Sequence, residues 1–278
     1  MIKDVMVPLQ VDAADEPRLA AAAAIAARFE GQIIGLFFNL LPLLALPVEV
    51  DQPQDLVIGL LRRAKEAGDE KVAALAVRMG QLGVPFEIRR FDAFPEDVTE
   101  IAVREARASD TFVVLRPDAD MEDPDRFVES VLLGNGRHLY LLPSGYDPAR
   151  LPGKHMLIAW NGSREAARAV AEAMPFLHIA QKITVLVIVR ESPPVEREAV
   201  LGVDLKHYLG HHGMKAELRH VKASNTGTSA TLMSEALKCN ADTIVLGGYG
   251  HSRTRERLLG GTTYELLQKA PIPVIMAH

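Results

Sequence analysis

The sequence predicts an α/β protein built from two tandem, doubly wound domains, each with a five-stranded parallel sheet covered by helices on both faces. Three observations lead to this prediction. Strand-like and helix-like segments alternate along the chain, the alternation repeats once, and each repeat has the length of an ordinary α/β domain. The 278 residues are 48% hydrophobic and 24% charged, which is typical of a globular chain.

The first strand–helix–strand unit of each repeat is the clearest part of this pattern. Short apolar runs at 3–10 and 154–161 lead into alanine-rich segments of helical period, and second strands follow at 33–38 and 184–189. The second copy lies 151 residues after the first for both strand pairs, 5 to 156 and 33 to 184. A constant offset across three elements indicates an internal duplication.

The remaining strands complete each repeat at a smaller offset. Third strands are predicted at 85–91 and 215–221, fourth strands at 111–115 and 243–247, and fifth strands at 138–143 and 273–278. Repeat one therefore has roughly 20 extra residues between its second and third strands. The turn-rich segment 144–153 separates two predicted domains, 1–146 and 152–278.

An apolar, proline-containing stretch at 33–48 begins in the second strand and continues into the extra residues. It is shorter than the roughly 20 residues that span a bilayer, and Asn39, Pro42 and Pro47 interrupt it. We interpret it as a buried strand that continues into an apolar loop. A partner-binding patch is the alternative interpretation.

A glycine-rich loop follows the fourth strand of repeat two. Glycines let backbone amides approach a phosphate closely, while a helix N-terminus and threonine hydroxyls add hydrogen-bond donors. In a doubly wound sheet, ligands bind beyond the carboxyl ends of the first and fourth strands, where this loop lies. The alternative is an ordinary strand-ending turn and helix cap. The candidate residues are Gly247, Gly250, Gly260, Gly261, Thr262 and Thr263.

The matching loop of repeat one has a different chemistry. Residues 116–125 contain five carboxylates and no glycine, and carboxylates beside a triphosphate are repulsive. The net charge is −9 for residues 1–150 and +4 for residues 151–278, together the −5 of the chain. The sequence therefore predicts that any nucleotide binds in repeat two.

These features resemble the universal stress protein family, whose ATP-binding members carry the motif G-x2-G-x9-G-[ST] after the fourth strand. Gly247, Gly250 and Gly260 match that spacing, and the tail KAPIPVIMAH resembles the final strand of the family. The turn from Ala159 to Ser163 resembles the one that ends the first strand. The resemblance implies sheets of order 3-2-1-4-5 that pack as a pseudo-dimer within one chain; whether two tandem chains form a homodimer is left open.

The resemblance also implies site residues and a cofactor, ATP or AMP with Mg²⁺. The three glycines of the motif would cradle the phosphates and ribose, and Thr262 or Thr263 would supply hydroxyls. In the first-strand turn after Ala159, Asn161 would face the adenine or ribose, and Ile188 would pack on the base.

Two residues depart from the family pattern. Gly261 stands where the motif has Ser or Thr, and Asn161 stands where Asp is usual. Because each lost hydrogen bond costs about 1 kcal/mol, the two changes together are expected to weaken binding about tenfold or more without abolishing it.

Other function classes have weaker support. No catalytic constellation is visible, so at most very slow ATP hydrolysis is expected. His207, His211 and His212 are interpreted as a helix face and not as a metal site. The acidic total charge and few aromatics argue against nucleic-acid binding, and a single cysteine without a signal peptide predicts a cytoplasmic protein that is not in the membrane.

We therefore expect a stress-response-type regulatory protein that binds ATP or AMP in its C-terminal repeat. The alternative is a scaffold or interaction module of the same fold that binds no nucleotide and docks a partner through the apolar region 39–50. An adenylating enzyme would need a catalytic group that the sequence does not reveal.

Overall fold

The computed structural model describes residues 1–42, 53–116, 124–147, 153–189, 200–250 and 261–278. These residues form two compact units, Ile2–Val113 and Val114–His278, which divide inside strand β4 (Thr111–Leu115). The predicted boundary between residues 146 and 152 separates the two copies of the sequence repeat, whereas these two units are separated by their compactness. The domain limits 1–146 and 152–278 therefore remain a prediction.

The unit Ile2–Val113 contains parallel strands in the order β3-β2-β1-β4. Its elements are β1 (Asp4–Leu9), α1 (Asp15–Phe29), β2 (Gln32–Leu40), α2 (Pro53–Gly80), β3 (Phe86–Ala93), the short 3₁₀ turn η1 (Pro95–Asp97), α3 (Val98–Ala106) and the first residues of β4.

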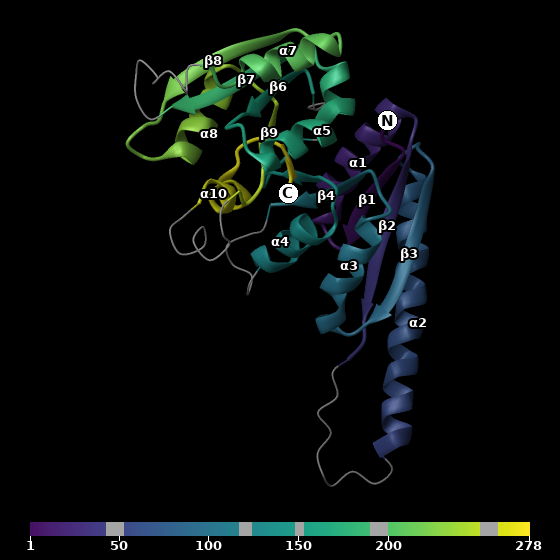
Figure 1. The fold of residues 1–278 in the computed structure, drawn as a ribbon. Helices are drawn as coiled ribbons and strands as arrows, with labels where there is room; N and C mark the ends of the chain where they lie inside the picture. The colour runs from purple at the N-terminus through teal and green to yellow at the C-terminus, as the bar shows by residue number, and fades with distance from the viewer. Residues whose placement is uncertain (43–52, 117–123, 148–152, 190–199, 251–260) are drawn as a thin grey trace. The chain divides into compact units, whose positions relative to one another are not determined.

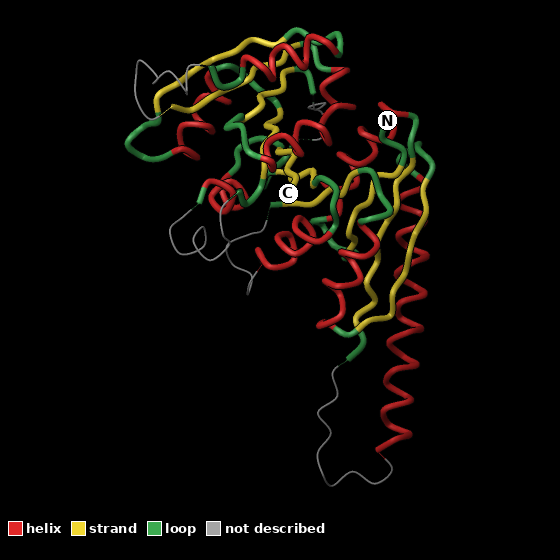
Figure 2. The backbone as a smooth tube through the Cα atoms, in the orientation of Figure 1, coloured by secondary structure: helices red, strands yellow, loops and turns green. Residues whose placement is uncertain are grey.

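Helix α2 explains most of the extra length of repeat one. It has 28 residues, whereas its counterpart in the second repeat, α7 (Val203–His211), has 9. Figure 2 shows α2 running well past the ends of the neighbouring strands. At this protruding end Leu56 and Ile58 are 45% and 63% exposed. The prediction placed the extra residues in an apolar loop; the helix takes up most of them, and residues 43–52 lie outside the described ranges.

The unit Val114–His278 contains the end of repeat one and all of repeat two (Figure 1). Its elements are α4 (Pro124–Gly134), β5 (Leu139–Leu142), β6 (His155–Ala159), α5 (Arg164–Ile179), β7 (Lys182–Val189), α7, β8 (Ala216–Lys222), α8 (Thr228–Lys238), β9 (Thr243–Gly247), α10 (Thr262–Lys269) and β10 (Val274–Ala277).

The strands of this unit confirm the predicted doubly wound fold. The second repeat has the order β8-β7-β6-β9-β10, which is 3-2-1-4-5 within the repeat, and all its neighbouring pairs are parallel. The fifth strand of repeat one, β5, pairs antiparallel with β10, with Tyr140 opposite Ile275. This pairing is why residues 124–147 cluster with repeat two.

The two faces of the second-repeat sheet are covered by different helices. The segment that enters α7 packs on Val185 and Val187, and helix α5 packs on the same face at Gly247. Helices α8 and α10 contact each other on the opposite face. None of the helices in the described part of the chain combines the length and apolar character needed to cross a membrane.

Candidate functional site

The candidate site lies where the winding of the second-repeat sheet reverses. Strands β6 and β9 are parallel neighbours, with Ala159 opposite Leu246, so their carboxyl ends and the loops that follow lie side by side. From β6 the chain crosses to β7 on one side, and from β9 it crosses to β10 on the other. Open α/β sheets bind ligands at such a switch point.

The turn after β6 is held by hydrogen bonds and starts helix α5. The side-chain oxygen of Asn161 accepts a hydrogen bond from the Ser163 amide (3.0 Å), and Gly162 between them has a φ of 73°. The Ser163 hydroxyl accepts from the Ala166 amide (3.1 Å) and so caps α5. The sequence had offered no role for Ser163; a serine directly before a helical period is the signal of an N-cap.

Gly247, at the end of β9, is required by packing. A Cβ at this position would lie 2.4 Å from the Ala166 nitrogen, 2.4 Å from the Glu165 carbonyl carbon and 2.8 Å from the Glu165 oxygen. These are backbone atoms of the first turn of α5, which cannot rotate away. The close approach of helix and strand demands glycine here whatever the loop binds.

Gly250 has a different environment. The nearest atoms to a Cβ there would be Glu165 Oε2 at 3.3 Å and the Ser163 hydroxyl at 4.0 Å, both at the ends of side chains, and Gly250 itself is exposed. The backbone of this part of the loop is therefore open to a ligand.

Tyr249 and Thr263 fix the loop to the rest of the unit. The Tyr249 amide donates to the Thr263 hydroxyl (2.9 Å), which is buried in the first turn of α10. The Tyr249 hydroxyl donates to the carboxylate of Glu129 on α4, which is also buried. Tyr249 has a φ of 52°, a left-handed conformation that costs energy for a residue with a side chain and that these bonds stabilise.

No side chain among the described residues caps the N-terminus of α10. Gly261 is its N-cap residue, and the first hydrogen bond of the helix joins the Glu265 amide to the Gly261 carbonyl (3.1 Å). The amides of the first turn therefore carry the partial positive charge of the helix without a capping side chain. Thr262 is half-buried there. Gly260 lies outside the described residues.

Ala159 and Ile188 share one face of the sheet. Ala159 pairs with Leu186, and Ile188 lies two residues further along β7, so both side chains point to the same side. Both are half-buried, unlike the fully covered residues beside them. This leaves an apolar ledge of Ala159 and Ile188 at the carboxyl edge of the sheet; the family resemblance implied that Ile188 packs on the base.

Glu165 is a residue of this site that the sequence did not single out. Its side chain is in the first turn of α5, it is 9% exposed, and it pairs with Arg164 (3.1 Å). Burial would raise the pKa of the Glu165 carboxyl, but hydrogen bonds from its own backbone amide and from Arg164, together with the Arg164 charge, outweigh burial and lower that pKa below its usual value. The carboxylate is therefore ionised at neutral pH.

In repeat one, the turn after β1 is occupied by the chain itself. The carboxylate of Asp15, fully buried, accepts hydrogen bonds from the amides of Gln10 (3.0 Å) and Val11 (2.8 Å) and pairs with Arg18 (2.7 Å). Arg78 of α2 also contacts this carboxylate (3.4 Å). Backbone amides that would be offered to a ligand anion are used by Asp15.

Part of the sequence matches a known protein family. Residues 153–278 match the sequence model of the Universal stress protein family. No curated protein sequence matches the chain.

Solved structures match over the whole length. A universal stress protein from Archaeoglobus fulgidus DSM 4304 has a TM-score of 0.71 and 16% identity, covering 99% of this chain and 95% of its own. A functionally unknown protein from Pseudomonas aeruginosa PAO1 has a TM-score of 0.64 and 15% identity, covering 99% and 92%. A putative universal stress protein from Pseudomonas aeruginosa UCBPP-PA14 has a TM-score of 0.63 and 14% identity, covering 99% and 93%. At these identities the likeness concerns the fold, which spans both repeats.

Proposed function

Because residues 153–278 match the sequence model of the Universal stress protein family, we propose that this protein binds an adenine nucleotide, ATP or AMP, in its C-terminal repeat and works as a nucleotide-responsive regulatory protein in the stress response. The proposal places it in the cytoplasm, where adenine nucleotides are abundant. It makes the antiparallel pairing of β5 and β10 the seam of an intramolecular pseudo-dimer; association of two chains as a homodimer is a further part of the proposal.

One observation carries the proposal: the N-terminus of α10, which no described side chain caps, lies against the glycine loop at the switch point. The 2.9 Å hydrogen bond between the Tyr249 amide and Thr263 brings the two together. An anion at this place would receive backbone amides and the helix dipole, which is the general way helix N-termini bind phosphate.

The remaining residues take roles that follow from their positions, apart from Gly260, whose role is the one that the family resemblance implies. Gly250, Gly260, Gly261 and the Thr262 hydroxyl would contact phosphates, with Mg²⁺ screening their charge. Asn161 would contact the ribose or adenine, and the base would lie on the apolar ledge of Ala159 and Ile188. Gly247 and Thr263 act indirectly, because they set the position of the loop.

The experiment is to denature the purified protein and chromatograph the supernatant for released nucleotide, alongside thermal unfolding with added AMP or ATP and Mg²⁺. We expect adenine nucleotide in the extract or a rise in the unfolding midpoint with added ligand. Gly250→Asp should remove both effects, because it puts a carboxylate in the loop. Gly210→Asp is the control: it adds the same charge on α7, where a Cβ at Gly210 meets no atom within 4 Å. An empty extract with no thermal shift would contradict the proposal.

A second candidate is a scaffold that binds no nucleotide. It is favoured by the exposed Leu56 and Ile58 on the protruding end of α2. Gly261→Ser separates the two: it should tighten nucleotide binding under the first proposal, because it restores a hydroxyl at the helix N-terminus, and should change nothing under the second.

A further inference from the structure

We propose that Glu165 is a specificity-determining residue that makes the site favour an adenine ligand of low phosphate charge, adenosine or AMP, over a triphosphate. This inference rests on the proposed nucleotide site and names which member of the ligand class that site takes.

The position of Glu165 follows from the close packing of α5 on β9. Since Gly247 has no side chain, the backbone of residues 165 and 166 can lie directly against the end of β9. A single methyl group added at Gly247 would clash with that backbone. That contact holds the first turn of α5 at the mouth of the switch point. The Glu165 carboxylate extends from this turn to the loop, and its Oε2 atom would be 3.3 Å from a Cβ on Gly250.

The carboxylate takes a place that an anion would otherwise use. Helix α5 begins at the switch point, and the amides of its first turn would attract a phosphate. Here the Ser163 hydroxyl accepts the Ala166 amide, and the buried Glu165 carboxylate belongs to the same turn. Of the two helices that begin at the switch point, α5 presents a negative side chain, whereas no described side chain caps the N-terminus of α10.

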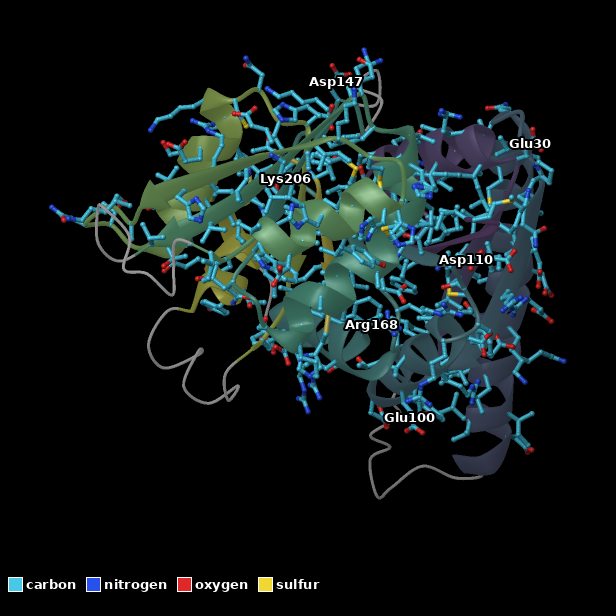
Figure 3. The ribbon with its side chains drawn as sticks, turned by 45° about the horizontal axis from the view of Figure 1, so that its top comes forward. Glu30, Glu100, Asp110, Asp147, Arg168 and Lys206 are labelled. Atoms are coloured by element: carbon cyan, nitrogen blue, oxygen red, sulfur yellow. The ribbon has the colours of Figure 1, made fainter. Side chains whose placement is uncertain are left out.

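The charge of Glu165 is only partly balanced by its described neighbours. The Arg164 side chain that pairs with it is 81% exposed, so water and salt screen its charge. Arg168, one turn further along α5 (Figure 3), is engaged instead with Glu172 at 2.7 Å. Glu265, the acidic residue on α10, accepts a hydrogen bond from Ser229 and adds no positive charge.

The effect on a ligand grows with the number of phosphates. Adenosine has no charge to repel, AMP carries one phosphate, and free ATP carries three. A carboxylate beside Gly250 costs most for the last of these, because Coulomb repulsion sums over the charges. Mg²⁺ reduces the penalty for ATP, since it neutralises part of the triphosphate charge.

The experiment measures dissociation constants for adenosine, AMP and ATP in the presence of EDTA, for the full chain and for a charge series at position 165. In the unmodified protein we expect AMP to bind more tightly than ATP. In Glu165→Gln the ratio of the ATP to the adenosine dissociation constant should fall about tenfold, and in Glu165→Lys it should fall further. Glu217→Gln, an exposed carboxylate on β8 that pairs with Lys182, is the control for net charge and should leave the ratio unchanged.

Circular dichroism and the unfolding midpoint establish that each variant is folded, and Glu165→Ala is the substitute if the lysine variant is not. An ATP-to-adenosine ratio that stays the same in the glutamine and alanine variants overturns this inference but leaves the nucleotide site standing. Absence of binding by all three ligands to the unmodified chain overturns the proposed function instead.

Discussion

Replacing Gly247 by alanine is expected to destabilise the C-terminal repeat strongly, although it adds one methyl group. The added Cβ would lie 2.4 Å from two backbone atoms of α5 and 2.8 Å from a third, against a normal contact of about 3.5 Å or more. These short contacts can be relieved only if α5 moves as a unit away from β9. Such a movement would disturb the packing of buried side chains on α5 such as Val170 and Phe176. Overpacking of this kind costs about 3 kcal/mol, at the upper end of its usual range, because no flexible side chain can yield.

Urea unfolding followed by circular dichroism gives the change in free energy, and calorimetry gives the midpoint. For a unit of this size, about 3 kcal/mol lowers the midpoint by about 6–12 °C. Gly250→Ala is the matched control three residues along: the nearest atom to its Cβ would be a Glu165 carboxylate oxygen at 3.3 Å, on a side chain that can rotate, so its effect should stay within about 0.5 kcal/mol. If both variants have the stability of the unmodified protein, the packing role of Gly247 is wrong.

Three further predictions follow from the geometry of the site and of the unit that contains it. Ser163→Ala should cost about 1 kcal/mol of unfolding free energy because α5 loses its cap, while Ser163→Asp, which can also cap, should retain most of it; urea unfolding compares the two. Thr263→Val should cost about 1–3 kcal/mol because the buried Tyr249 amide loses its acceptor, whereas Thr262→Val should have little effect on the same measurement; equal losses would refute the distinction. Burial, then the charges of the neighbouring carboxylates, raises the pKa of Tyr146 to about 12, so it should ionise late in an absorbance titration of the phenolates. Since a tyrosine in the unfolded chain ionises near pH 10, the stability that the folded state gains from keeping Tyr146 neutral is complete below pH 10 and is lost as the pH rises towards 12. Tyr146→Phe should remove this part of the pH dependence of stability. An ordinary pKa for Tyr146 would contradict the prediction.

Much of the fold was predictable because hydrophobic periodicity determines where strands and helices lie. The predicted strands 111–115 and 243–247 agree with β4 and β9 at both ends, and the order 3-2-1-4-5, which the family resemblance implied, is present in repeat two. The antiparallel pairing of β5 with β10 was not predictable from the pattern, since a short buried strand has the same sequence signature in either direction. The length of α2 was also missed, because its weakly amphipathic, protruding N-terminal part gives no clear helical period.

The candidate site was predicted in location but not in the roles of its residues. Spacing placed Gly247 and Gly250 in one motif, yet the two meet different surroundings, the backbone of α5 in one case and an open edge in the other. A motif records where glycine is present and not which neighbour requires it. Glu165 and Tyr249 escaped notice because their importance arises from contacts with residues far along the chain, 85 residues away for Glu165 and Gly250 and 120 for Tyr249 and Glu129.

Equilibrium dialysis of the full-length protein against radiolabelled AMP tests the central claim most directly, since it counts occupied sites even when binding is weak. One nucleotide binding site in repeat two and none in repeat one predicts saturation at one equivalent per chain. It also predicts that Gly250→Asp abolishes saturation and that Gly210→Asp preserves it. Two equivalents per chain would contradict the blocking role assigned to Asp15, and no saturable binding at millimolar AMP would contradict the proposed function itself.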